Sequence, residues 1–403
     1  MMGVGKTSAA IRMINQSKPE QHFIFISQFL DEVQRVKKAC PNKRFFEPFK
    51  KGKTNKSDNL IELLEAGHNI ATTHSLFSKC TPRVIELIRQ GNYVLILDEV
   101  MDVVEALEIA DGDTQLFFDY GILSVDEHSV VSWHAPEYLK RNGAYADFAY
   151  SVSSGYVIMD DGALMIWKFP FSMFDAFKDV YILTYMFDAQ LQKYYFDLCG
   201  ATYDFIGARQ REDGEYEFCA VDEMTTRCSN LLDFVHIVYD SRMNSIGDDP
   251  YALSKNWFIK AEKRKIDGKT LFAQIKLMLE SFVRHKWEGI PADKILWSTH
   301  KNYRSKISGK GYASSFLAFN YRATNDYKDR NHLMYIINVY VPSGLRMYFE
   351  SYGIFVNQER FALSAMVQWI WRSAIRDGKE IWLYLPSSRM RRLLENWLKE
   401  VSN

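Results

Sequence analysis

The first residues of the chain indicate phosphate chemistry. The run GVGKTS over residues 3–8 matches the end of the phosphate-binding pattern G-x-x-x-x-G-K-[ST] and leads directly into an apolar helical pattern. In such a loop the backbone N–H groups face phosphate oxygens, the lysine meets the β- and γ-phosphates, and the hydroxyl binds Mg²⁺. We therefore expect Thr7 to be a Mg²⁺ ligand, and we expect ATP to be bound by Gly3, Gly5, Lys6, Thr7 and Ser8.

The pattern is incomplete at its start. Counting back from Gly5, its first glycine would fall one position before Met1, and the strand that should precede the loop would also lie before Met1. We expect either that the coding sequence begins further upstream or that the chain is a truncated copy.

A second chemical feature follows a run of apolar residues. Residues 93–97 have no polar side and lead into Asp98 and Glu99. At the carboxyl end of a buried strand, the aspartate can hold Mg²⁺ through its water shell, and the glutamate can orient and deprotonate an attacking water. We expect Asp98 to bind the metal and Glu99 to be catalytic; the alternative is that Asp98 only caps a helix.

The segments around these residues alternate between strand and helix patterns. We predict strands over residues 22–27, 69–73, 93–97 and 181–184, and helices over residues 9–14, 29–40, 61–66, 84–89 and 190–199. Strands without polar alternation, separated by helices, are typical of a parallel sheet covered on both faces. Two apolar runs flank Asp160-Asp161-Gly162-Ala163, which predicts a β-hairpin inside an insertion over about residues 111–179.

A second α/β block follows. Its predicted strands cover residues 234–239, 295–297, 316–319 and 381–385, and its main helices cover residues 270–285 and 364–375. We therefore predict an α/β protein with a first lobe over residues 1–200, which carries the hairpin insertion, and a second lobe over residues 201–403.

In motif order the chain resembles superfamily 2 helicases, and more narrowly the DEAD/DEAH-box-like helicase proteins of bacteriophages and prophages. The resemblance implies two tandem P-loop (RecA-like) lobes with ATP and Mg²⁺ as cofactors. FIS over residues 25–27 and ATTHSL over residues 71–76 stand where the family has nucleic-acid loops, which implies contacts from Thr73 and His74. Residues 183–185 resemble the motif that couples ATP state to strand binding, of which Thr184 is retained.

Residues 368–376, QWIWRSAIR, resemble the sixth helicase motif, Q-x-x-G-R-x-x-R. Gln368 and Arg372 match, Trp371 replaces the glycine, and the second arginine falls one position late, at Arg376. A spacing of i, i+4, i+8 would place the three polar side chains along one helix face. The resemblance implies catalytic roles for them, with one arginine stabilising charge on the γ-phosphate; the alternative is a solvated basic face.

Basic residues beside aromatic ones suit a single nucleic-acid strand, which needs charge neutralisation and stacking. We expect such contacts from Lys301, Arg304 and Lys310. GKG over residues 309–311 and NYRATND over residues 320–326 resemble the fourth and fifth motif regions of the family, which contact the phosphodiester backbone and the ATP ribose. The resemblance implies such contacts from Arg322, Thr324 and Asn325. The alternative is a basic, solvated loop.

Charge is balanced overall but divided along the chain. The 50 basic and 50 acidic residues cancel, yet residues 251–403 hold 26 Lys and Arg against 13 Asp and Glu, a surplus of 13. A basic second half indicates a polyanionic partner. The five cysteines form no CxxC pair, and no apolar run approaches the length of a membrane span, so we expect a cytoplasmic protein with no membrane contact.

Together these features predict an ATP-dependent helicase or translocase. The resemblance implies a role in phage or prophage replication or recombination in the host cytoplasm, on single- or double-stranded DNA, with phage or host replication proteins as partners and RNA as an open alternative. Two other functions stay open. One is a terminase-type packaging ATPase, whose nuclease domain would need a cluster of metal-binding carboxylates. The other is a nucleic-acid-binding remnant without turnover.

Overall fold

The computed structural model describes residues 5–50, 52, 55–78, 81–107, 109, 112–137, 145–162, 164–223, 231–266, 269–320 and 326–402. The chain divides into two compact units. The amino-terminal unit contains Gly5–Met224 and Pro342–Val356, and the carboxy-terminal unit contains Thr225–Val341 and Asn357–Asn403. The division thus falls at residue 224 rather than at residue 200, and a segment late in the chain returns to the amino-terminal unit.

Four parallel strands form the main sheet of the amino-terminal unit, in the order β2-β1-β3-β9. Their bounds are β1 Phe23–Ser27, β2 Ile70–Thr73, β3 Val94–Asp98 and β9 Asp179–Leu183. Every residue of β1 is buried, which is the consequence of covering a parallel strand on both faces. The parallel α/β arrangement expected from the apolar runs is confirmed here.

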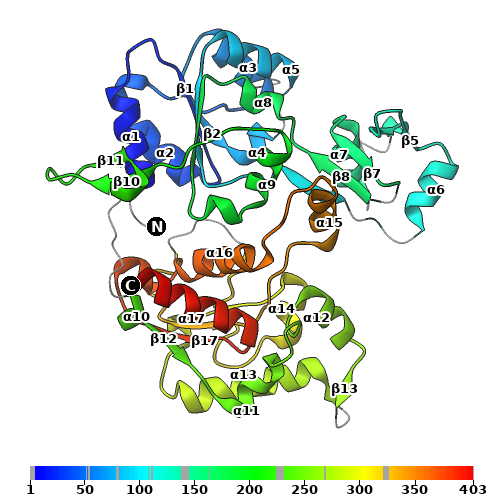
Figure 1. Ribbon diagram of the computed structural model, residues 1–403, viewed down its shortest axis with the longest axis vertical. Helices are drawn as coiled ribbons and strands as arrows, with labels where there is room; N and C mark the ends of the chain where they lie inside the picture. Colours follow the sequence, from blue (N-terminus) through cyan, green and yellow to red (C-terminus); the bar gives the residue numbers. More distant parts are fainter. Residues whose placement is uncertain are drawn as a thin grey trace. The chain divides into compact units, whose positions relative to one another are not determined.

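Helices connect these strands and pack around the sheet (Figure 1). They are α1 Lys6–Gln16, α2 Leu30–Ala39, α3 Lys56–Glu65, α4 His74–Phe77, α5 Pro82–Gln90, α8 Ser172–Asp175 and α9 Leu191–Leu198. Ile14 of α1 and Val33 of α2 join Phe25 and Ile96 of the sheet in one buried cluster. This cluster holds α1 against the strands that carry the chemistry.

The insertion between β3 and β9 is a small module with its own core. It has two antiparallel sheets, one with strand order β4-β8-β7 and one formed by β5 and β6, and the turn between β7 and β8 places Asp161 and Gly162 in the left-handed region at φ 47° and 71°. The predicted hairpin is therefore confirmed. The elements of the module are β4 Val104–Leu107, α6 Asp113–Asp119, β5 Leu123–Val125, β6 Val131–Trp133, α7 Ala146–Ser153, β7 Val157–Asp160 and β8 Leu164–Lys168.

Two further segments complete the amino-terminal unit. A hairpin of β10 Gly207–Gln210 and β11 Tyr216–Cys219 is followed by a short 3-10 helix, Val221–Glu223. Helix α15, Ser343–Ser351, packs its Phe349 against Tyr194 of α9, with ring centroids 5.9 Å apart. Neither the hairpin nor the return of α15 was expected from the sequence.

The carboxy-terminal unit is built on a second parallel sheet, in the order β12-β17-β16-β15. Its strands are β12 Val235–Val238, β15 Ile295–Ser298, β16 His332–Tyr335 and β17 Ile381–Tyr384. Its helices are α10 Leu231–Phe234, α11 Ser241–Asn244, α12 Lys255–Ala261, α13 Leu271–Lys286, α14 Arg304–Ile307, α16 Gln358–Ile370 and α17 Ser388–Ser402. A short hairpin, β13 Lys265–Ile266 with β14 Lys269–Thr270, precedes α13.

One predicted strand of this unit is wrong and one strand was missed. Phe316 forms only an isolated bridge to Trp297, whereas the apolar run after Asn331 supplies β16 between β15 and β17. A short, fully buried strand has no periodicity that distinguishes it from neighbouring apolar runs. Among the helices of the described ranges, none is long and apolar enough to span a bilayer.

Candidate nucleotide site

The carboxyl edge of the amino-terminal sheet brings the two predicted chemical motifs together. Asp98 is the last residue of β3, and the Thr7 hydroxyl on the first turn of α1 donates to its Oδ1 at 3.0 Å. The Ser27 hydroxyl, at the end of the neighbouring strand β1, donates to Oδ2 at 3.2 Å. Parallel strands end at the same edge of a sheet, which is why residues 71 positions apart in the sequence meet here.

Charge at this edge is concentrated and poorly solvated. Burial raises the pKa of Asp98 to about 7, with a further increase from the neighbouring Glu99, while the hydrogen bonds from Thr7 and Ser27 act in the opposite direction. Burial lowers the pKa of Lys6, and Glu99 and Asp98 raise it. Lys6, Asp98 and Glu99 are half-buried and close together, and a bound phosphate and a cation would compensate their charges.

Glu99 has an unusual backbone conformation. Its φ is 70°, in the left-handed region that a residue with a side chain rarely adopts, and its N–H donates to the Leu183 carbonyl at 3.3 Å. The Thr184 hydroxyl donates to its Oε2 at 2.9 Å. Backbone strain of this kind is common at functional sites. Here it occurs at Glu99, whose carboxylate is held by Thr184, the residue that follows β9.

The donor set fits Mg²⁺. A threonine hydroxyl and a carboxylate are hard oxygen ligands, and Mg²⁺ commonly uses one or two such groups together with substrate phosphates. Thr7 and Asp98 are the residues that would hold the ion, and their expected roles as metal ligands stay predictions.

Other predicted residues of this unit lie around the same edge. Thr73 ends β2 and His74 begins α4, so both lie at the carboxyl edge of the sheet, and their expected contacts with nucleic acid stay predictions. Ser8 lies on α1, where its hydroxyl accepts a hydrogen bond from Arg35 at 3.1 Å. Gly5 is the N-cap of α1 with φ 80°, and Gly3 lies outside the described residues.

In the carboxy-terminal unit, the expected helix face of Gln368, Arg372 and Arg376 is wrong. Helix α16 ends at Ile370. Ser373 has an extended backbone, with φ −93° and ψ −169°, and its hydroxyl donates a hydrogen bond to the Ile370 carbonyl at 2.6 Å. Arg376 lies in a separate 3-10 turn. The three residues therefore do not share a helix face, because the serine hydroxyl and the extended residue end the helix between them.

The two arginines also differ in environment. Arg372 is buried at 5% exposure, whereas Arg376 is exposed. Gln368 is half-buried on α16, with its amide donating to the Ser364 hydroxyl at 3.3 Å. Their expected catalytic roles stay predictions.

The basic residues expected to contact nucleic acid are on the surface. Lys301, Arg304 and Lys310 are exposed, and the Arg304 guanidinium lies 4.8 Å from the ring centroid of Phe316. The Lys310 backbone N–H donates to the Glu280 carboxylate at 2.8 Å. Arg322, Thr324 and Asn325 lie outside the part of the chain that the structure describes.

Two contributors to the amino-terminal site were not among the candidate residues. Ser27 bonds Asp98, and Arg35 bonds Ser8. Ser27 ends a buried run that also stands where the helicase family has a nucleic-acid loop, but neither signal predicts a bond to Asp98, and Arg35 lies on an ordinary amphipathic helix. Both contacts depend on the way in which the strands and helices pack.

Comparison with known proteins gives two matches. Residues 229–398 match the family model described as the YonV C-terminal Rossmann-like domain, which agrees with the parallel sheet of the carboxy-terminal unit. The whole chain is 40% identical over 407 residues to the SPbeta prophage-derived uncharacterized protein YonV of Bacillus subtilis (strain 168), covering 99% of this chain and 97% of the relative. With this identity over nearly its full length, the chain belongs to the YonV family.

Proposed function

We propose that the protein hydrolyses ATP at the carboxyl edge of the amino-terminal sheet and uses the reaction to move along nucleic acid. The observation that carries the proposal is the 3.0 Å hydrogen bond from Thr7, in the phosphate-loop sequence, to Asp98, at the end of a buried strand. A helix N-terminus with a lysine and a hydroxyl beside an acidic pair is the constellation that nucleoside triphosphate hydrolysis requires.

Each side chain has a chemical task in this proposal. The N-terminus of α1 and the Lys6 ammonium attract the triphosphate. The Glu99 carboxylate accepts the proton of the attacking water, and its hydrogen bond from Thr184 keeps the carboxylate oriented. Mg²⁺, when bound by Thr7 and Asp98, supplies charge neutralisation at the phosphates.

The proposed polymer is DNA, and the proposed architecture is a pair of RecA-like lobes. The surplus of 13 positive charges in residues 251–403 supports a polyanionic partner, as do the exposed Lys301, Arg304 and Lys310. The Bacillus relative is a prophage-derived protein, which supports a phage setting. These observations favour translocation over nucleotide hydrolysis alone.

A packaging ATPase with a nuclease domain is less well supported. Within the described residues, no three His, Cys, Asp or Glu side chains gather as a metal-binding group. A nuclease of that kind uses such a cluster.

The test is ATP turnover by the full chain with Mg²⁺, with and without single-stranded DNA. We expect hydrolysis that requires Mg²⁺ and increases when single strands are added. Binding of ATP or DNA without turnover would support a remnant instead. A folded protein that neither binds nor hydrolyses any nucleoside triphosphate would overturn the proposal.

A further inference from the structure

The hairpin β10–β11 packs directly on Gly5, the N-cap of α1. A Cβ built on Gly5 would lie 2.2, 2.4 and 2.5 Å from three atoms of the Tyr216 ring. The ring therefore occupies the space that any side chain at position 5 would need. Gly5 has φ 80°, so this close contact and the left-handed backbone both require glycine.

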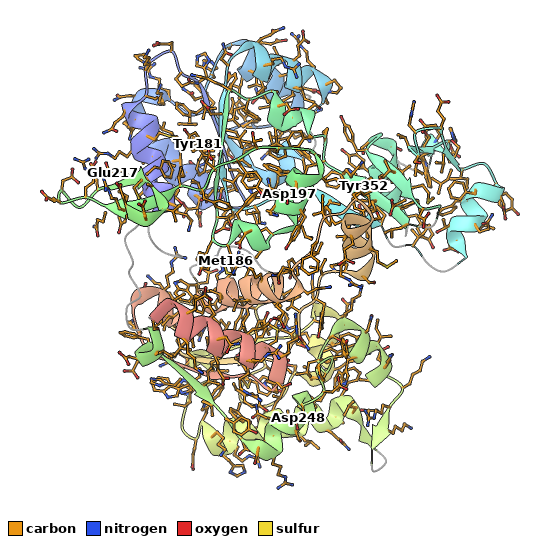
Figure 2. The ribbon with its side chains drawn as sticks, in the orientation of Figure 1. Tyr181, Met186, Asp197, Glu217, Asp248 and Tyr352 are labelled. Atoms are coloured by element: carbon orange, nitrogen blue, oxygen red, sulfur yellow. The ribbon has the colours of Figure 1, made fainter. Side chains whose placement is uncertain are left out.

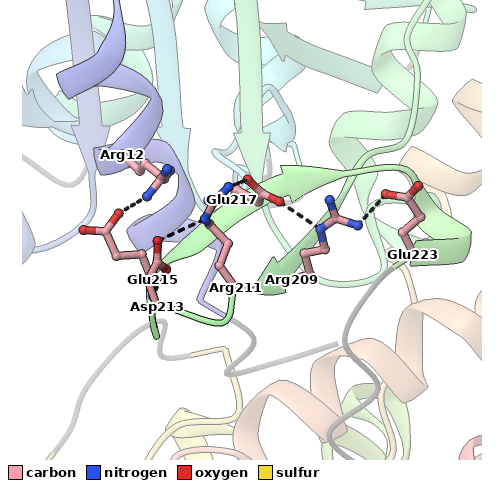
Figure 3. A network of polar contacts seen from close by, with 7 residues as sticks. All are labelled: Arg12, Arg209, Arg211, Asp213, Glu215, Glu217 and Glu223. Atoms are coloured by element: carbon pink, nitrogen blue, oxygen red, sulfur yellow. Dashed lines mark hydrogen bonds and ion pairs between the residues drawn. The ribbon is translucent and has the colours of Figure 1, made fainter.

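The hairpin is anchored to the rest of the amino-terminal unit by ion pairs. Arg12 on α1 pairs with Glu215, which lies next to Tyr216 (Figure 3). Within the hairpin, Glu217 accepts from Arg209 at 2.9 Å and from Arg211 at 2.7 Å. The pairing of one carboxylate with two guanidiniums stiffens the two strands against each other.

A stacked pair of rings supplies a second anchor. Phe218 of β11 stacks on Tyr181 of β9, with centroids 5.9 Å apart and planes at 11°. Figure 2 labels Tyr181 on the sheet and Glu217 on the hairpin. Tyr216 is thus carried by a hairpin that is fixed both to α1 and to the sheet edge.

We propose that Tyr216 is a positioning residue for the phosphate loop, an inference that rests on the proposed ATP site. A loop residue at a left-handed glycine has unusual conformational freedom, which must be lost when phosphate binds. By packing on Gly5, the ring holds this glycine and the first turn of α1 in one conformation before the nucleotide arrives. It acts through Gly5 on the direction of the Lys6 and Thr7 backbone N–H groups.

This role predicts a separation of binding from turnover. Tyr216→Ala removes the ring but leaves Asp98, Glu99 and Thr184 in place. We expect its KM for ATP to rise about tenfold, corresponding to about 1.4 kcal/mol, while kcat stays close to wild type. Tyr216→Phe keeps the ring and should restore the wild-type KM.

A second measurement needs no nucleotide. The Ala9 N–H donates to the Gly5 carbonyl at 2.8 Å, so its hydrogen exchange reports on the order of the loop. We expect faster exchange in the peptide containing Ala9 for Tyr216→Ala and wild-type exchange for Tyr216→Phe. Glu223→Gln is the matched control, because it removes the ion pair between Arg209 and Glu223, which lies in the 3-10 helix after the hairpin, and leaves Tyr216 in place.

The outcomes separate the two proposals. Wild-type KM and exchange in Tyr216→Ala would overturn the positioning role, and so would equal defects in the Phe variant. If wild type itself does not bind ATP, the proposed function fails and the exchange experiment still decides whether Tyr216 orders the loop. If Tyr216→Ala does not fold, Arg12→Gln removes the ion pair between α1 and Glu215 without altering the ring, and it should raise KM and exchange in the same direction by a smaller amount.

Discussion

Two aspartates show how differently the two parallel sheets use their carboxyl edges. Asp98 ends β3 in the amino-terminal unit, and burial raises its pKa to about 7. Asp240 follows β12 in the carboxy-terminal unit, and its pKa is lowered by the Met243 N–H and by Lys286. The environment of Asp98 disfavours its charged form, whereas the charge of Asp240 is stabilised by hydrogen bonds and an ion pair.

The partners of Asp240 explain the contrast. It is the N-cap of α11, accepting from Met243 N–H at 3.0 Å, and it pairs with Lys286 at 3.0 Å. Asp98 accepts hydrogen bonds from two hydroxyls, those of Thr7 and Ser27. A sheet edge whose charges are already compensated stabilises the fold, whereas an edge with charge left to compensate can bind a cation and a phosphate.

The largest expected effect follows from the proposed catalytic carboxylate. Glu99→Gln should lower kcat for ATP by about 10²–10⁴-fold while ATP binding is retained, because a general base contributes that much to the rate. Steady-state hydrolysis and a nucleotide-binding titration measure the two quantities. Asp240→Asn is the matched control at the other edge and should hydrolyse ATP like wild type. Unchanged turnover in Glu99→Gln would remove its assignment as the base.

The next effect tests whether the polar groups of the carboxy-terminal unit are structural. Arg389 is 8% exposed and donates to Asn338 Oδ1 at 2.8 Å, to the Val339 carbonyl at 2.9 Å and to the Gln358 carbonyl at 3.0 Å. Arg389→Met leaves Asn338 Oδ1 and the Val339 carbonyl buried without this donor, so we expect about 2–4 kcal/mol less stability.

Denaturant unfolding of the full chain measures that loss, and the ATP affinity of the folded variant should be unchanged. Arg392 provides the comparison on the same helix. It pairs with Glu359 at 2.9 Å with both side chains more than half exposed, and Arg392→Ala should change stability by less than about 1 kcal/mol. Equal losses in the two variants would contradict a buried anchoring role for Arg389.

A smaller effect is expected for nucleotide affinity. Lys6→Ala should weaken ATP binding about tenfold, because one charge-assisted contact to phosphate is lost. A fluorescence titration with a labelled nucleotide measures this change. Lys301→Ala, a cation of the other unit, should leave it unaltered. If Lys301→Ala lost ATP binding and Lys6→Ala did not, the nucleotide site would not be in the amino-terminal unit.

The smallest effect concerns the exposed cations. Binding to single-stranded DNA should weaken with salt by about 0.7 log units per log unit for each phosphate contacted, so alanine at Lys301, Arg304 and Lys310 together should flatten the slope by up to about 2. Titration of a labelled oligonucleotide at several salt concentrations measures the slope, with duplex DNA and RNA as comparators. A flat response in wild type would mean that the partner is not a nucleic acid.

Some features of this protein are determined by local sequence. The uniformly apolar run before Asp98 predicts a buried strand, and Asp161-Gly162 predicts the hairpin turn, because both depend on neighbouring residues only. The phosphate-loop run and the acidic pair were recognisable for the same reason. The charge difference between the two parts of the chain follows from counting alone.

Contacts between distant residues were decided by tertiary structure. The Thr184 hydroxyl reaches Glu99 across 85 positions, and the Tyr216 ring covers Gly5, because strand order and packing place them together. The end of α16 before Arg372 and the return of α15 to the amino-terminal unit likewise have no local pattern. Sequence periodicity records which side of an element is buried, but the neighbour that buries it is chosen only when the sheets and helices pack.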